Sequence, residues 1–403
     1  MTRMARCGVS INDVEYKQKD LGGRASRLCL HKAIHFQVSK DPFSIKLLLK
    51  PLRSITEREI MSTMKEAIVY KGPSVKIVNS PIPEPGPEQV VIQVVVSGSN
   101  PKDWKIPEWL DQTANTGDDI AGIVYSVGEN VWEFKKGDRV ASFHEMLTSG
   151  GSFAEYAVGW QHTTFHIPKK TSFEDAATLP LAAMTAAIGL HVRLGLDAPW
   201  VPSSKNSETP LVVYGGASAV GAYAIKLAQK ANIHPIIAVA GRGIPFVEKL
   251  LDPSKGDAIV DYRKGDDAVV SGIKDALKGK KLHYAFDAVS EHNSYTNIVQ
   301  VLEKDGNITL VLPGKKYEGI PETVHLTVTT VGEAHKGDKE FAYIFFRYIA
   351  RGLDEGWFTP HPAEVVKGGL EGVEKALTDL KEGKASAVKY VFRIADTPGV
   401  KDA

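Results

Sequence analysis

The residue types with the clearest chemical use form a short run of small side chains at 215–221. The run lies between residues 211–214, an apolar stretch expected to be a buried strand, and residues 220–231, expected to be a helix. Small residues are needed where a backbone approaches a diphosphate, and a helix N-terminus offers N–H groups and positive potential to that anion. The residues expected to bind it are Gly216, Ala217, Ser218, Ala219, Val220 and Gly221.

Against a G-x-G-x-x-G template, Gly216 and Gly221 fit but Ser218 stands at the middle glycine, so the turn alone is a weak signal. The context strengthens it. Strands are expected at 211–214, 234–240, 258–262, 284–289 and 308–312, and helices at 220–231, 245–251, 266–277 and 294–302. This alternation predicts an α/β fold with a doubly wound parallel sheet, whose ligand lies at the carboxyl ends of the strands. We therefore expect a dinucleotide there.

The end of the second strand favours NADPH over NADH. An acid at this point would bind the ribose 2′-hydroxyl of NAD and repel a 2′-phosphate. Here the strand ends in Gly241 and Arg242, and the guanidinium is suited to a phosphate. The alternative is an arginine that is merely solvated in a loop.

Residues 64–166 have a different pattern. Short β runs at 89–96, 120–127 and 138–143 are separated by Gly and Pro, which predicts an irregular β domain. Helices are expected within 173–189, a surface loop at 194–209, a loop up to about 335, helices at 341–352 and 370–382, and a last strand at 389–394.

Composition narrows the function classes. The 403 residues carry a net charge of +1, which gives no reason to expect nucleic acid or an anionic membrane as partner. Only Cys7 and Cys29 are present, which favours an intracellular location. The longest apolar stretch, at 179–190, is short for a bilayer span. We expect a cytoplasmic protein with no membrane segment.

The first 60 residues hold 12 basic and 6 acidic side chains and lack sustained alternation. No apolar block follows a basic start, so a secretory signal is excluded. We expect residues 1–60 to be a disordered extension, or the result of a wrongly assigned start, without catalytic purpose. A mitochondrial transit peptide is the alternative, but Asp13, Glu15 and Asp20 argue against it.

Several ordered motifs over residues 64–394 resemble the medium-chain dehydrogenase/reductase superfamily, in its zinc-free quinone oxidoreductase and trans-acting enoyl reductase branch. They are residues 100–105 (NPKDWK), 117–122 (GDDIAG), 137–140 (GDRV), 151–156 (GSFAEY), 179–180 (LP), 185–186 (TA), 215–221 and 261–263 (DYR). The resemblance implies a GroES-like domain over 61–188, a Rossmann NADP-binding domain over 189–338, and a return to the first domain over 339–403.

The resemblance also implies roles for individual residues. Thr185 matches a threonine of the nicotinamide pocket, and Tyr262 a tyrosine beside the adenosine 2′-phosphate. The other residues implied to contact the cofactor are Asn100, Pro101, Lys102, Asp103, Val289, Leu312, Pro313, Ser386 and Ala387. For each, packing or turn geometry is the alternative.

Zinc enzymes of the superfamily have a Gly-His-Glu motif and an earlier cysteine ligand. Asp118 occupies the His position here, and both cysteines precede residue 30, so we expect no metal. A substitute cluster of His144, Glu145, His162 and His166 is the alternative, with surface or packing histidines favoured.

We therefore expect a zinc-independent reductase that transfers hydride from NADPH to an activated C=C bond or a quinone. The expected donors to the developing oxyanion are the Asn100 amide, the Thr185 hydroxyl, backbone N–H groups or a ribose hydroxyl of the cofactor, and no residue stands out as the acid. The partner would be an enone, quinone or enoyl acceptor, or an acyl chain carried by a synthase, and the protein a monomer or homodimer. Alternatives are a stand-alone enoyl reductase of a polyketide-type pathway, a zinc alcohol dehydrogenase and a non-catalytic NADPH-binding protein.

Overall fold

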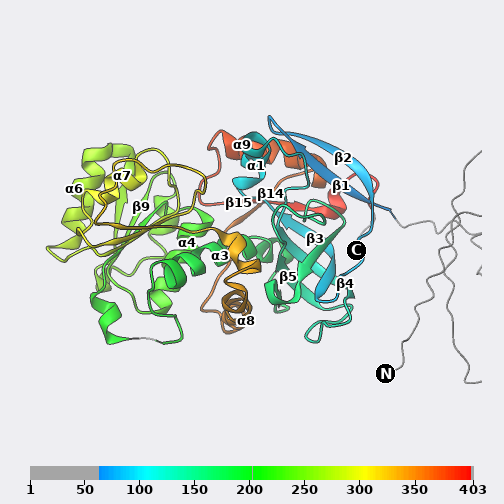
Figure 1. Cartoon of the computed structure of the whole chain (residues 1–403), viewed down its shortest axis with the longest axis horizontal. Coiled ribbons are helices and arrows are strands. Elements are labelled where there is room, and N and C mark those ends of the chain that lie inside the picture. The colour runs from blue at the N-terminus through cyan, green and yellow to red at the C-terminus, as the bar shows by residue number, and fades with distance from the viewer. Residues whose placement is uncertain (1–62, 202, 401–403) are drawn as a thin grey trace, which may run out of the picture. The chain divides into compact units, whose positions relative to one another are not determined.

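A computed structural model describes residues 63–201 and 203–400, so the extension expected at 1–60 lies outside the described residues. Two β-sheets organise the described part (Figure 1). One sheet is entirely parallel, with its strands in the doubly wound arrangement. In order across the sheet they are β10 (Ala258–Asp261), β9 (Ile236–Ala240), β8 (Leu211–Tyr214), β11 (Tyr284–Asp287), β12 (Asn307–Leu310) and β13 (His325–Val328).

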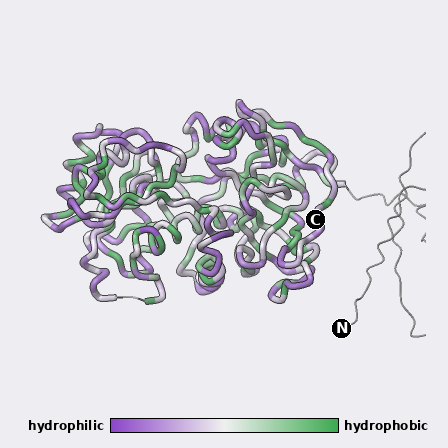
Figure 2. The backbone as a smooth tube through the Cα atoms, viewed as in Figure 1, coloured by the Kyte–Doolittle hydropathy of each residue, from purple (hydrophilic) through white to green (hydrophobic). Residues whose placement is uncertain are grey.

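The parallel strands are short and apolar because helices cover both faces of the sheet. Every residue of β8 and β9 is buried. Four helices connect the strands: α4 (Ala219–Lys230), α5 (Ile244–Val247), α6 (Asp266–Leu277) and α7 (Ser294–Val299). In α6 the buried residues recur three to four positions apart, as in an amphipathic helix. Figure 2 shows hydrophobic residues along the strands of this sheet. The predicted α/β class and doubly wound sheet are confirmed.

The second sheet combines strands from both ends of the described chain. β15 pairs antiparallel with β3, so the C-terminal strand completes a sheet begun far earlier in the sequence. Its strands, in order, are β14 (Ala363–Val365), β15 (Lys389–Arg393), β3 (Gln89–Gly98), β4 (Asp119–Val127), β5 (Arg139–Phe143) and β7 (Thr164–His166), with β6 (Tyr156–Trp160) also on β3. A separate hairpin is formed by β1 (Thr63–Tyr70) and β2 (Ser74–Pro81).

Helices α3 (Pro180–Ala187) and α8 (Lys339–Glu355) lie between the two sheets (Figure 1). All eight residues of α3 are buried, and α3 packs against both α4 and β5. The helical run Phe173–Arg193, which includes α2 (Phe173–Ala176), is longer than the apolar stretch predicted. By length and composition it would reach across a bilayer, but 83% of its most apolar window is buried inside the protein. It is the core helix of the fold.

Several elements differ from the sequence prediction. Helix α1 (Lys102–Leu110) lies inside the region expected to be all β, and β13 lies inside the loop expected to run to residue 335. Pro101 and Pro107 made the α1 segment resemble a turn, but Pro101 only precedes the helix, where proline is tolerated, and Pro107 lies inside it. The helix expected at 245–251 is shorter, as α5, and α9 spans Val373–Lys381.

Lys226 on α4 is buried, and its ammonium donates to the carbonyls of Thr359 (2.7 Å) and Pro360 (3.3 Å). Burial lowers the pKa of Lys226 from 10.5 to about 8. A pKa that is lower in the folded state means that the fold disfavours the charged form. This cost is complete below pH 8 and disappears as the pH rises to 10.5.

Lys226→Met is therefore expected to raise the free energy of unfolding by about 1–3 kcal/mol at pH 7, after the lost hydrogen bonds are counted. The advantage over the wild type should shrink between pH 8 and 10. Urea unfolding of both proteins at pH 7 and at pH 9.5 measures this difference in the free energy of unfolding. The control is Lys274→Met, which replaces an exposed lysine on α6. A gain that is equal at both pH values would contradict the buried-charge explanation.

Candidate active site

The turn between β8 and α4 requires glycine at two positions. Gly215 has a φ of +80°, which favours glycine, and a Cβ on Gly221 would lie 2.3 Å from the Gly215 carbonyl oxygen. Ser218 is the N-cap of α4, and its hydroxyl accepts a hydrogen bond from the Gly221 N–H at 3.0 Å. The serine at the middle-glycine position thus caps the helix. With only methyl groups on Ala217 and Ala219, the start of α4 is suited to an anion.

The loop before β15 rests on this turn. A Cβ on Gly243 would lie 2.4 Å from the Ala217 Cβ, 3.2 Å from the Ala387 Cβ and 3.6 Å from the Ser386 Oγ. Ala387 has a positive φ of 55°, an uncommon conformation for a residue with a side chain. The predicted residues Ser386 and Ala387 are therefore brought to the β8–α4 turn by the fold, although they lie about 170 positions from it in sequence.

Other predicted residues lie at the same edge of the parallel sheet. A Cβ on Gly215 would lie 2.7 Å from the Val289 Cγ2, so Val289 packs against the turn. A Cβ on Gly241 would lie 2.5 Å from the Tyr262 ring, so Gly241 leaves room for a ring that is 46% exposed. Leu312 and Pro313 follow the end of β12, the neighbour of β11. The structure therefore gathers these residues at the strands' carboxyl ends.

Arg242 has a structural contact that the sequence did not predict. Its guanidinium donates to the Gly383 carbonyl at 2.5 Å and lies 3.5 Å from the Lys384 carbonyl oxygen. It thereby links the end of β9 to the loop before β15. A 2′-phosphate bound by Arg242 would have to share the guanidinium with these carbonyls.

Asn100 is part of a buried polar network. Its amide Nδ2 donates to Asp119 Oδ2 at 2.6 Å, and its Oδ1 accepts from the Lys389 ammonium at 3.1 Å. The same ammonium is 2.5 Å from Asp119 Oδ2, and the other Asp119 oxygen accepts from the Leu181 N–H at the start of α3. One of the two Nδ2 protons of Asn100 is thus already used.

Thr185 lies one turn further along α3. Its hydroxyl donates to the Leu181 carbonyl at 2.8 Å, and the side chain is almost fully buried. In this arrangement the Thr185 oxygen is left as an acceptor, for example for a sugar hydroxyl. A role as donor to a developing oxyanion requires the hydroxyl to rotate away from Leu181.

Lys102 and Asp103, which the resemblance implies as cofactor contacts, belong to an ionic cluster at the start of α1. The Lys102 ammonium pairs with Asp103 Oδ1 at 2.9 Å and with Asp118 Oδ2, and it donates to the Thr116 carbonyl. The other Asp118 oxygen is 2.8 Å from His144 Nδ1. Burial raises the pKa of Asp118, but Lys102 and His144 outweigh it, so that pKa is lowered overall.

The substitute metal cluster considered from the sequence does not form. His144 contacts Asp118, His162 lies against His335, His166 packs on Phe134, and Glu145 accepts from Trp160. Over residues 63–201 and 203–400, no group of three or more His, Cys, Asp or Glu side chains is placed to hold a metal ion. The histidines are packing residues, with the exception of His144.

Sequence reasoning missed the cations that hold this site together. Lys389 pairs with Asp119, and Lys105 reaches Glu291, which follows β11, at 2.7 Å. The signal was Asp118-Asp119 at the start of an apolar strand, because buried carboxylates need cationic or hydrogen-bonding partners. The identity of the partners could not be read, since Lys389 lies 270 residues away.

Comparison with known proteins agrees with this geometry. Residues 86–169 match the alcohol dehydrogenase GroES-like domain. The trans-enoyl reductase fsr4 of Gibberella fujikuroi is 52% identical over 314 residues, which cover 77% of this chain and 93% of that protein.

Solved structures share the fold at lower identity. A putative zinc-dependent alcohol dehydrogenase from Rhizobium etli CFN 42 superposes with a TM-score of 0.70 at 22% identity, over 83% of this chain and 98% of that one. The quinone oxidoreductase from Coxiella burnetii has a TM-score of 0.64 at 22% identity, over 82% and 99%. The chain belongs to the medium-chain dehydrogenase/reductase superfamily, in its quinone oxidoreductase and enoyl reductase branch. It is an oxidoreductase that uses a nicotinamide cofactor.

Proposed function

We propose that this oxidoreductase is NADPH-dependent and zinc-independent, and that it reduces a C=C bond conjugated to a carbonyl group. The 52% identity to a trans-enoyl reductase carries the proposal and favours a stand-alone enzyme acting on acyl chains held by a synthase. Reduction of quinones is the second candidate, supported by the shared fold with a quinone oxidoreductase.

The residues of the nucleotide site fit the cofactor. The β8–α4 turn excludes a Cβ at Gly221 and directs a capped helix N-terminus at the diphosphate. The end of β9 carries Gly241 and Arg242 and no acid, which favours a 2′-phosphate. When bound there, NADPH supplies the hydride of the reaction.

The protein's own residues position the acceptor and meet its charge. As hydride adds to a conjugated C=C bond, negative charge grows on the acceptor oxygen, and a well-placed donor is worth about 10²–10³ in rate. The second Nδ2 proton of Asn100 is suited to this purpose, because Lys389 and Asp119 fix the amide in orientation. Thr185 would contribute by accepting a hydrogen bond from the cofactor or acceptor.

The carboxylate at the zinc-ligand position supports a reaction without metal. Asp118 is engaged by Lys102 and His144, so its oxygens already have cationic and hydrogen-bonding partners. A metal ion would have to displace the Lys102 ammonium. The site chemistry is therefore assigned to hydrogen bonds and positioning.

The test is NADPH oxidation with a panel of enones, quinones and enoyl thioesters, including thioesters on a carrier domain, with and without a chelator. Turnover of enoyl thioesters, unaffected by chelator, is expected. Loss of turnover on metal removal would contradict the proposal that the enzyme works without zinc. Tight NADPH binding without turnover of any acceptor would favour a non-catalytic nucleotide-binding protein.

Arg242→Gln is expected to weaken NADPH binding about tenfold and leave NADH binding unchanged, since only the 2′-phosphate loses a charged partner. Fluorescence titration with each nucleotide measures this. Arg351→Gln, which removes an exposed arginine on α8, is the matched control. Equal weakening of NADH and NADPH would mean that Arg242 acts only by holding the loop at Gly383.

A further inference from the structure

A chain of polar groups leads from the protein surface to the Lys102 ammonium. Thr148, which is exposed, has its hydroxyl oxygen 3.2 Å from His144 Nε2, and His144 Nδ1 lies 2.8 Å from Asp118 Oδ1. Asp118 Oδ2 then pairs with Lys102 Nζ. The His144 and Asp118 side chains are each 2% exposed, whereas Lys102 is 20% exposed. These polar contacts thus pass through the protein interior and become accessible to solvent again at Lys102.

Lys102, at the end of these polar contacts, lies on the side of α1 that faces the parallel sheet. Lys102 and Lys105 are three residues apart on α1, so they share one face of the helix. Lys105 reaches across to Glu291, in the loop that follows β11. That loop adjoins Val289, which packs on the phosphate-binding turn. Lys102 therefore lies on the side of α1 that looks toward the proposed cofactor site.

One contact of the ammonium is replaceable. The ammonium forms ion pairs with the carboxylates of Asp103 and Asp118, whereas it donates a hydrogen bond to the neutral carbonyl of Thr116. Charge-assisted hydrogen bonds are roughly twice as strong as neutral ones. An enolate at the site would compete with the neutral Thr116 carbonyl, and so would receive the N–H that Thr116 accepts here.

We propose that Lys102 is the acid of the reaction and that Asp118, His144 and Thr148 form the relay that recharges it. The proposal rests on the proposed function, because it assigns the proton that the reduction of a C=C bond requires. It also explains why no isolated acid stands out in the sequence.

Hydride adds to the β-carbon, the C=C π bond breaks, and its electron pair becomes an enolate. The Lys102 N–H bond then breaks, its proton forms the new C–H bond at the α-carbon, and its electron pair stays on Nζ as a neutral amine. A proton from solvent enters at His144 Nε2 by way of the Thr148 hydroxyl, once this hydroxyl has turned from the Glu145 carbonyl and Nε2 has turned from the Ser149 carbonyl. The Nδ1 proton passes to Asp118 Oδ1, the carboxyl group rotates to bring this proton to Lys102 Nζ, and the ammonium is restored.

The electrostatics keep this acid charged. Burial alone would lower the pKa of Lys102, but the Asp103 and Asp118 carboxylates outweigh it and raise that pKa above its ordinary value. Lys102 is therefore protonated throughout the physiological range. An enolate is basic enough to take a proton even from such a weak acid.

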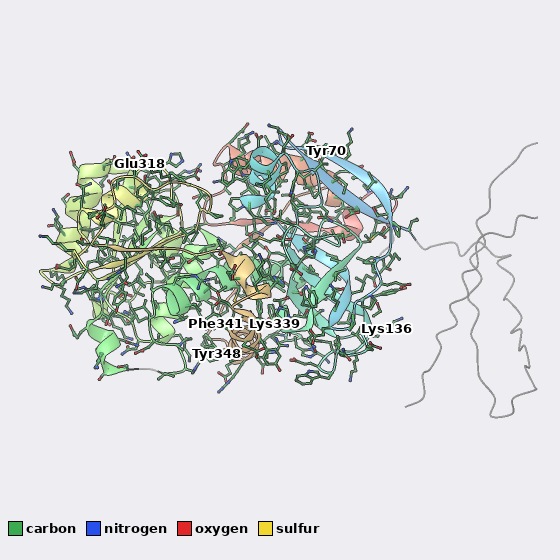
Figure 3. All side chains as sticks on the ribbon, viewed as in Figure 1. Tyr70, Lys136, Glu318, Lys339, Phe341 and Tyr348 are labelled. Carbon is green, nitrogen blue, oxygen red and sulfur yellow. The ribbon has the colours of Figure 1, made fainter. Side chains whose placement is uncertain are left out.

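The first experiment compares Lys102→Arg with the wild type. Arginine keeps the positive charge beside Asp103 and Asp118 but does not release a proton. We expect kcat to fall about 100-fold, in the range of general acid catalysis, with NADPH affinity unchanged. Lys136→Met, which removes an exposed lysine labelled in Figure 3, should behave as wild type. A Lys102→Arg enzyme with kcat within twofold of wild type would overturn the proposal.

The second experiment needs no turnover. In protein labelled with ¹⁵N at lysine Nζ, exchange of the Lys102 ammonium protons with water is followed by NMR. His144→Gln should slow this exchange several-fold and lower kcat about three- to tenfold, since water replaces the imidazole poorly. Thr148→Val, at the exposed end, should give a smaller effect in the same direction. Unchanged exchange in both variants would disprove the relay.

The experiments distinguish a failure of the proposed enzyme function from a failure of the assignment of Lys102 as the acid. If wild-type protein reduces none of the acceptors, the proposed function fails, and the exchange measurement still judges the relay. If the wild type reduces enoyl thioesters and Lys102→Arg does so equally well, only the assignment of the acid is wrong. Should Lys102→Arg not fold, His144→Gln and Thr148→Val decide the outcome.

Discussion

Lys389→Met is expected to lower the free energy of unfolding by about 3–5 kcal/mol, the loss typical of a buried ion pair broken on one side. Lys389 and Asp119 are 4% and 0% exposed, and Asp119 would be left buried without its cation. The loss should be large because Asp119 also holds Asn100 and the start of α3. Denaturant unfolding of the full chain measures it.

A surface ion pair provides the matched control. Lys381 pairs with Glu108 at 2.6 Å, also joining the C-terminal part of the chain to α1, but its side chain is 36% exposed. Lys381→Met should cost less than about 1 kcal/mol. Adding Asp119→Asn to Lys389→Met should restore part of the stability, since it removes the uncompensated charge. If Lys381→Met proved as costly as Lys389→Met, burial would not be the cause.

Gly221→Ala is expected to weaken NADPH binding at least about 100-fold. Its Cβ would lie 2.3 Å from the Gly215 carbonyl oxygen, a backbone atom that moves only if the whole turn moves. Displacing the turn shifts the start of α4, where the N–H groups are directed at the diphosphate. Fluorescence titration measures the affinity, and circular dichroism checks that the variant folds.

A second glycine of the same turn gives a graded comparison. A Cβ on Gly216 would lie 3.2 Å from the Ala238 Cβ and from the Ile225 Cδ1, which are side-chain atoms that yield slightly. Gly216→Ala should therefore weaken binding far less than Gly221→Ala. Equal losses, or a Gly221→Ala protein with normal affinity, would show that the turn does not bind the diphosphate.

Most of the parallel sheet was predictable because five of its six strands, all except β13, are encoded locally. Residues 211–214 and 266–277 were assigned with the bounds that the structure has, since an apolar run between polar turns and an amphipathic repeat are both short-range patterns. Helix α1 was missed because Pro101 and Pro107 suggest a turn, whereas contacts of α1 with β1 and α9 stabilise the helix. β13 was missed because its pairing with β12, rather than its own composition, makes it a strand.

The sequence by itself determined the α/β class and the turn at Gly215–Gly221, because these depend on side-chain size and on patterns a few residues long. Ser386 and Ala387 were expected near this turn only through the resemblance to a known superfamily, and the fold brings them there. Only the tertiary structure decided which charges pair. Lys389 joins Asp119, Lys102 joins Asp118, and Arg242 joins the Gly383 carbonyl. Ion pairs have no sequence periodicity, so their partners are set by which distant segments the two sheets bring together. The proposed proton path from Thr148 to Lys102 likewise depends on contacts that only the tertiary structure forms.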